Sequence, residues 1–215
     1  MRLSLPLTAN RTAVTLLQSV EAASIPASLK LFGMDTSDAL STYGVLTGMA
    51  LPCILFPSAV TSSVGTVLMP AVTKAQADGD PAGMAALIRK AASGCFLLGL
   101  ACCLFFLLSG SFLGEFLFHS SSAGKFILTL AWMCPFLYTN AALISSINGL
   151  GKTTSTFLIN MLSLGMRITS VFLAIPRCGI LGYLWGLLAS QAAVTVLAFL
   201  VLYRTGRKTF KTPHP

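Results

Sequence analysis

The stretch AASGCFLLGLACCLFFLLSGSF, residues 91–112, contains no charged side chain. It is longer than the ~20 apolar residues that an α-helix needs to cross the hydrocarbon core of a bilayer. The whole chain of 215 residues shares this character, with 55% hydrophobic and 9% charged residues and a mean hydropathy of +0.82. Soluble domains carry about 25% charged residues. Because backbone groups in lipid must be satisfied within each segment, the spans are α-helices, and we expect an all-α, polytopic membrane protein.

Apolar segments separated by polar ones predict six membrane spans, which together form one bundle over residues 1–204. Prolines at 52, 57 and 70 predict that the long second span is kinked or broken. Asp80-Pro81 is typical of a helix start, with a capping side chain followed by proline in the first turn. Residues 205–215 form a basic cytoplasmic tail. The six spans are expected at residues 6–31, 42–72, 91–112, 126–147, 154–175 and 180–203.

The lysines and arginines lie mostly on one side of the predicted bundle, which indicates its orientation. Three lie on one side, at Lys30, Lys125 and Arg177. Cytoplasmic loops are enriched in basic residues, so the richer side and both termini are predicted to be cytoplasmic. The net charge of +8 therefore reflects membrane topology, and we expect no nucleic-acid binding. The nine basic residues of the richer side are Arg2, Lys74, Arg89, Lys90, Lys152, Arg204, Arg207, Lys208 and Lys211.

We find no pattern for catalysis, a metal or a cofactor. The six cysteines form no CxxC pair, and five of them lie within apolar spans, as small packing residues do. His119 and His214 have no second ligand at metal spacing. The run NGLGKTT, residues 148–154, resembles the end of a phosphate-binding loop, but Ser146 stands where the pattern needs glycine and a membrane helix precedes it. The chain is therefore not expected to be an enzyme.

A polar stripe runs along the first predicted span. At 100° per residue, Asn10, Glu21 and Ser28 fall within about 20° of one another, with Arg11 and Gln18 within about 100° of Asn10. Such a stripe faces either other helices or a hydrated cavity, and its many polar groups favour the cavity. Arg11 lies about 8 Å into the helix, so it either snorkels to the interface or binds phosphate at the cavity mouth.

Glu21 and Arg167 are charged residues inside predicted spans, which makes each a candidate functional residue by default. Both of their spans run outward from the cytoplasm, which puts Glu21 about 22 Å in and Arg167 about 21 Å in. We therefore expect the two to form an ion pair or to share one hydrated cavity. A pair that serves structure alone and a pair that serves transport both remain open. In the second span, hydroxyl groups are expected to take the role of the backbone donors lost at a proline kink, by donating to the freed carbonyls. These residues are Ser58, Thr61, Ser62 and Ser63. In the later spans, Asn140, Asn148, Asn160 and Gln191 are expected to form interhelical hydrogen bonds.

Several short runs, in order and spacing, resemble one family. They are Pro6, Gln18-Ser19-Val20-Glu21, Ile25-Pro26, YGVLTGMALP at 43–52, LMPA at 68–71, NGLGK at 148–152, and Ile175-Pro176 followed by GILG at 179–182. In these runs the chain resembles the C-terminal lobe of polysaccharide and lipid-linked oligosaccharide flippases of the stage V sporulation protein B type. That family belongs to the superfamily of multidrug, oligosaccharidyl-lipid and polysaccharide exporters.

The resemblance implies one six-helix lobe of a two-lobe exporter fold. The chain would be a multi-pass protein of a bacterial cell membrane. A central cationic cavity would accept a lipid-linked diphosphate oligosaccharide or cell-wall precursor and move it by alternating access. In that picture Asn10, Arg11, Gln18, Glu21 and Arg167 line the cavity, with Arg167 arguing against a sodium site. An N-terminal six-helix lobe is expected on the same or a separate chain, so this chain is a fragment, a split-gene product or a remnant. The alternatives are half of a cation-coupled multidrug exporter and a non-transporting membrane subunit.

Overall fold

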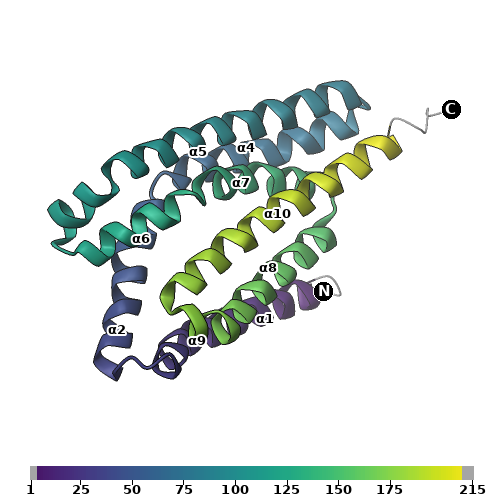
Figure 1. The fold of residues 1–215 in the computed structure, drawn as a ribbon. Coiled ribbons are helices and arrows are strands. Elements are labelled where there is room, and N and C mark those ends of the chain that lie inside the picture. The colour runs from purple at the N-terminus through teal and green to yellow at the C-terminus, as the bar shows by residue number, and fades with distance from the viewer. Residues whose placement is uncertain (1–3, 210–215) are drawn as a thin grey trace.

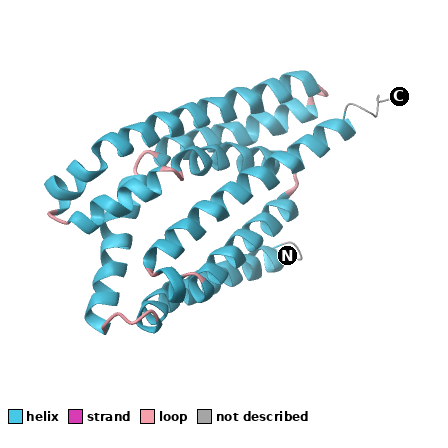
Figure 2. Cartoon of the chain, in the orientation of Figure 1, coloured by secondary structure: helices cyan, strands magenta, loops and turns pink. Residues whose placement is uncertain are grey.

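A computed structural model describes the backbone of residues 4–209 and the side chains of residues 14–205. Within residues 4–209 every regular element is a helix and no strand occurs, as Figure 2 shows. The predicted all-α class is therefore confirmed. The elements are α1 (Ser4–Leu31), α2 (Thr36–Val45), a π-helix η1 (Leu46–Ala50), α3 (Leu51–Leu55), α4 (Ser58–Ala77), α5 (Pro81–Phe118), α6 (Ser121–Ala131), α7 (Cys134–Gly149), α8 (Thr153–Leu173), α9 (Ile175–Cys178) and α10 (Ile180–Thr209).

The long helices form two layers (Figure 1). One layer holds α4, α5, α6 and α7, and the other holds α1, α8 and α10. Contacts of α10 and α8 with α7 join the two layers, while α2 crosses between them at one end. The polar interior described below lies between these layers.

Successive long helices run back and forth along the bundle, so that α1 begins and α10 ends at the same end (Figure 1). The connections at residues 78–80 and 150–152 lie at that end, and those at 32–35, 119–120 and 174–179 lie at the other. Lys74 and Lys152 thus share one end, and Lys30 and Arg177 share the opposite end. The alternation that the charge count requires is present along the described chain.

Four elements within the described residues are long and apolar enough to cross a membrane, namely Thr36–Leu55, α5, α8 and α10. A fifth crossing is possible if α6 and α7, bent by 52°, make one span. The chain is a multi-pass membrane protein, but the count of six apolar spans is not fully met. The helices α1 and α4 have the length of a span, yet their polar residues lower their hydropathy.

Several predicted boundaries differ from the structure. The connection between the first two predicted spans, at 32–41, is shorter, because Asp35 caps α2 and accepts a hydrogen bond from the Ser37 N–H at 3.4 Å. The expected continuous span at 126–147 is bent instead, because Pro135 near the start of α7 has no N–H to continue the helix ladder. The last helix continues to Thr209, beyond both the predicted end at 203 and the start of the tail at 205.

The expected start of α5 is confirmed. The Asp80 carboxylate accepts a hydrogen bond from the Gly83 N–H at 2.8 Å, and Pro81 occupies the first turn, where no N–H is needed. From there α5 continues for 38 residues, through the polar segment that the sequence suggested as a boundary. In its layer, α5 packs against all three other helices, α4, α6 and α7.

The predicted break in the second span is also confirmed, between Leu55 and Ser58. A break frees carbonyls that would otherwise accept helix hydrogen bonds. The Ser58 hydroxyl donates to the Leu55 carbonyl at 2.5 Å, and the fully buried Tyr138 of α7 donates to the Ile54 carbonyl at 2.7 Å. A hydroxyl next to the break and one from another helix therefore replace the missing backbone donors.

Small residues let the helices of the first layer approach closely, as is usual where lipid gives no hydrophobic driving force. A Cβ atom on Gly99 of α5 would lie 2.6 Å from the Cα atom of Pro135 in α7. Gly114 of α5 approaches the backbone of Gly124 in α6 in the same way. These contacts hold α5 against the bent α6–α7 pair.

Candidate functional site

A buried ion pair joins α1 and α8 within their layer, at mid-bundle. The Arg167 Nε of α8 donates to Glu21 Oε1 of α1 at 2.9 Å. The Glu21 side chain is 3% exposed and that of Arg167 is 27% exposed. The prediction that these charges lie at one depth and pair is confirmed. Because the carboxylate is withdrawn from water, its charge depends on this partner.

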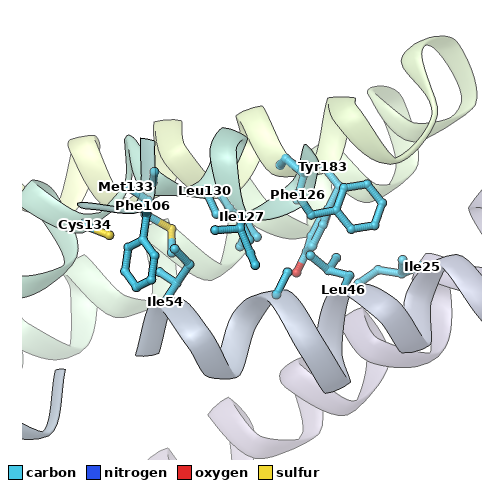
Figure 3. Packing of buried hydrophobic residues seen from close by; sticks show 14 of the residues in the cluster. Ile25, Leu46, Ile54, Phe106, Phe126, Ile127, Leu130, Met133, Cys134 and Tyr183 are labelled. Atoms are coloured by element: carbon cyan, nitrogen blue, oxygen red, sulfur yellow. The ribbon is translucent and has the colours of Figure 1, made fainter. Parts of the chain in front are cut away.

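Tyr183 of α10 completes the pair, and the sequence interpretation missed it. Its hydroxyl donates to Glu21 Oε1 at 2.7 Å and lies 3.5 Å from Arg167 Nη2, which donates to it. Figure 3 shows Tyr183 beside Phe126 and Leu46 in the largest buried apolar cluster. A tyrosine early in an apolar span was the available signal, because a buried hydroxyl almost always has a partner.

A hollow of about 190 Å³ lies on one side of this triad of Glu21, Arg167 and Tyr183. Gln18 and Tyr43 add polar groups to its wall, and the π-helix adds Leu46 and Thr47. π-Helical turns are rare overall, but those that occur are often found at functional sites. Their extra residue widens the helix and redirects its side chains. Here that turn lies against the charged triad.

A larger cavity of about 440 Å³ lies between the layers, and it is lined by residues of five helices. Arg167 and Gln18 line this cavity as well as the smaller hollow, so the two spaces share a wall. Arg167 is the only charged residue among the described side chains that line it. The remaining polar lining consists of Ser58, Thr61, Ser62, Asn140, Asn160, Ser163 and Gln191.

A network of hydrogen bonds fixes one wall of the larger cavity. Asn140 Nδ2 of α7 donates to Gln191 Oε1 of α10 at 2.8 Å, and Thr195 Oγ1 donates to Asn140 Oδ1 at 2.8 Å. Elsewhere Thr156 Oγ1 donates to Asn148 Oδ1 at 2.8 Å. The prediction that Asn140, Asn148 and Gln191 make interhelical bonds is therefore confirmed.

The predicted cavity residues fall into two groups. Gln18, Glu21 and Arg167 are brought together around the shared wall of the two spaces. Asn10 and Arg11 lie in α1, but their side chains are outside the described residues, so their predicted place in the cavity stays a prediction. The expected cationic character is weaker than predicted over the described residues, because Arg167 already faces the charge of Glu21.

The five cysteines of the predicted spans are buried or half-buried, as packing residues are. Cys95, Cys103 and Cys134 are buried, Cys53 and Cys102 are half-buried, and Cys178 is exposed. Over the part of the chain that the structure describes, no cluster of three His, Cys, Asp or Glu side chains is placed to hold a metal ion.

Comparison with known proteins gives one informative relative. The chain is 25% identical over 199 residues to stage V sporulation protein B of Bacillus subtilis (strain 168). The matched region is 92% of this chain and 38% of that protein, so the chain spans well under half of the relative's length. The similarity confirms the resemblance predicted from the sequence and is consistent with one lobe of a larger protein. No protein-family model matches, and no solved structure matches.

Proposed function

We propose that this chain forms the C-terminal lobe of a flippase that carries lipid-linked oligosaccharides or cell-wall precursors across the cytoplasmic membrane by alternating access. The observation that carries the proposal is the polar cavity of about 440 Å³ inside an otherwise apolar membrane bundle. A bundle that served only as a scaffold would gain nothing from an unfilled polar interior, because polar groups in a membrane are costly. The similarity to stage V sporulation protein B supports the same family of functions, including a role in sporulation.

Arg167 is the proposed contact for the diphosphate of the substrate. A guanidinium has five N–H donors, and Arg167 uses one on Glu21 and one on Tyr183. The other donors are free to bind an anion in the larger cavity, which Arg167 also lines. Arg–phosphate hydrogen bonds are among the strong ones, since both partners are charged. Gln18, and Asn10 and Arg11 nearer the start of α1, would add contacts along the same path.

In this proposal Glu21 positions Arg167 and holds its charge in place while the cavity is empty. Substrate phosphate would then compete with Glu21 for the guanidinium. That competition would make the state of the site depend on whether the cavity is occupied. An N-terminal six-helix lobe, on the same or a separate chain, would supply the other wall of the cavity, and both ends of the lobe would lie in the cytoplasm of a bacterial cell.

The test is binding and translocation by the chain isolated with any lobe that co-purifies, reconstituted in vesicles. A fluorescent polyprenyl-diphosphate oligosaccharide should bind, and Arg167→Met should weaken binding by tenfold or more, through loss of a charge-assisted contact. Glu21→Gln should fold but translocate slowly. If both variants translocate as the unmodified protein does, these residues have no part in transport.

The alternatives make different predictions. A cation-coupled multidrug exporter needs an acid that is free to bind its ion, whereas Glu21 is occupied by Arg167 and Tyr183. Dependence of transport on a sodium or proton gradient would favour it. A non-transporting subunit would fold normally and bind no lipid-diphosphate ligand.

A further inference from the structure

A second hollow lies on the opposite side of α7 from the polar cavity, and the proposed transport path does not use it. The helices α5 and α10 both pack on α7 but contact each other only sparsely, and a groove lies between them. The groove has a volume of about 600 Å³ and is lined almost entirely by apolar groups. Its lining includes Met84, Ile88, Ala92, Phe96, Leu143, Phe199 and Leu202.

Two basic side chains lie at this groove. Arg89 lines it and makes no ion pair with any described residue. Lys152 Nζ donates to the Thr205 hydroxyl at 2.6 Å, and Thr205 also lines the groove. No acidic side chain is among the lining residues. The nearest acid in the sequence is Asp80, and its carboxylate accepts a hydrogen bond from the N–H of Gly83.

The position of these residues along the bundle matches one leaflet of a bilayer. On α5 the part of the groove from Arg89 to Phe96 spans about 10 Å at 1.5 Å per residue, which fits within the ~15 Å of half the hydrocarbon core. Arg89 precedes the uncharged stretch at 91–112, so it lies at the level of the lipid head groups. Tyr203, which also lines the groove, is of the residue type enriched at that level.

We propose that this groove binds an anionic phospholipid of the bilayer, with its phosphate at Arg89 and Lys152 and one acyl chain along Ala92, Phe96 and Phe199. The charge at the head-group end is the reason for choosing a phospholipid over a protein partner. Basic pockets between membrane helices bind lipid head groups in this way. The inference does not depend on the proposed transport function, because it concerns other residues on the other side of α7.

The test is native mass spectrometry of the chain released from nanodiscs that contain phosphatidylglycerol and phosphatidylcholine with the same acyl chains. We expect phosphatidylglycerol to be retained about tenfold over phosphatidylcholine, and Arg89→Gln to lower its retention about fivefold. Arg177→Gln, an exposed arginine at the other end of the bundle, is the matched control and should change nothing. Inorganic phosphate should not displace the lipid, because it lacks an acyl chain.

A second pair of variants tests the groove without touching its charge. Ser93 is exposed and lines the groove, so Ser93→Trp should fill it and abolish retention of both lipids. Leu97 is 63% exposed on the same helix and is outside the groove, so Leu97→Trp should retain lipid normally. Equal retention of the two lipids by the unmodified chain, normal retention by Arg89→Gln and Ser93→Trp, or a second polypeptide bound in place of lipid would overturn the proposal.

Discussion

Arg167→Met should be more damaging to the fold than Glu21→Gln, although the two residues are partners. Methionine fills a similar space but leaves the Glu21 carboxylate 3% exposed, with Tyr183 as its remaining described donor. Removing one partner of a buried ion pair costs about 3–5 kcal/mol, because the other charge is left without compensation. We therefore expect Arg167→Met to lose at least about 3 kcal/mol of unfolding free energy.

Glu21→Gln acts differently because of where the remaining charge lies. The glutamine oxygen can still accept from Arg167 and Tyr183, and the arginine is 27% exposed, so its charge can be solvated from the cavity. A loss of about 1–2 kcal/mol is expected, the scale of a weakened hydrogen bond to a charged group. The double variant should be more stable than Arg167→Met alone, because it contains no unpaired buried charge.

The measurement is equilibrium unfolding of the four proteins in mixed micelles with increasing denaturing detergent. The double-mutant cycle should give a coupling energy of about 1–3 kcal/mol. Two results would refute the reasoning: single effects that add to within about 0.5 kcal/mol, which would mean that the residues do not interact, or a Glu21→Gln protein less stable than Arg167→Met.

Three further predictions concern packing, the helix break and topology. Gly99→Leu should prevent α5 from packing on α7 and abolish the folded state in the same unfolding assay, whereas Gly94→Ala, whose Cβ meets no atom within 4 Å, should stabilise α5 by up to ~1 kcal/mol. Tyr138→Phe should cost about 1–3 kcal/mol by leaving a buried carbonyl at the break unsatisfied, and a Tyr43→Phe control that costs as much would contradict this. Cys178 should react with a membrane-impermeant thiol reagent added to intact cells, and labelling only after the cells are opened would reverse the proposed orientation.

The π-helix and the break in the second span together form a segment at which the bundle could bend. The π-helix directly follows α2 and precedes α3, which ends at the break at residues 56–57. It also lines the hollow beside the triad. Hydroxyl groups satisfy the Ile54 and Leu55 carbonyls just before this break. Side-chain hydrogen bonds can exchange without unfolding a helix, so, if the proposed transport function holds, we expect the bundle to bend at this segment.

The amino-acid sequence by itself determined the class of this protein. The uncharged stretches require helices in lipid, and the alternation of basic residues requires a back-and-forth path. The prolines at 52, 57 and 70 predict a kinked or broken second span, and the break lies at Pro57, whereas Pro70 lies inside α4. Depth along two helices also brought Glu21 and Arg167 to one level, because rise per residue is fixed. Each of these inferences depends on local geometry alone.

Only the tertiary structure decided which groups meet across the bundle. Tyr183 joins the ion pair, and Tyr138 satisfies the break at Ile54, because helices distant in sequence pack side by side. The groove between α5 and α10 likewise follows from how both helices pack on α7 with little contact between themselves. Periodicity assigns a residue to a face of its helix, but the partner of that face is set by close packing of the whole bundle.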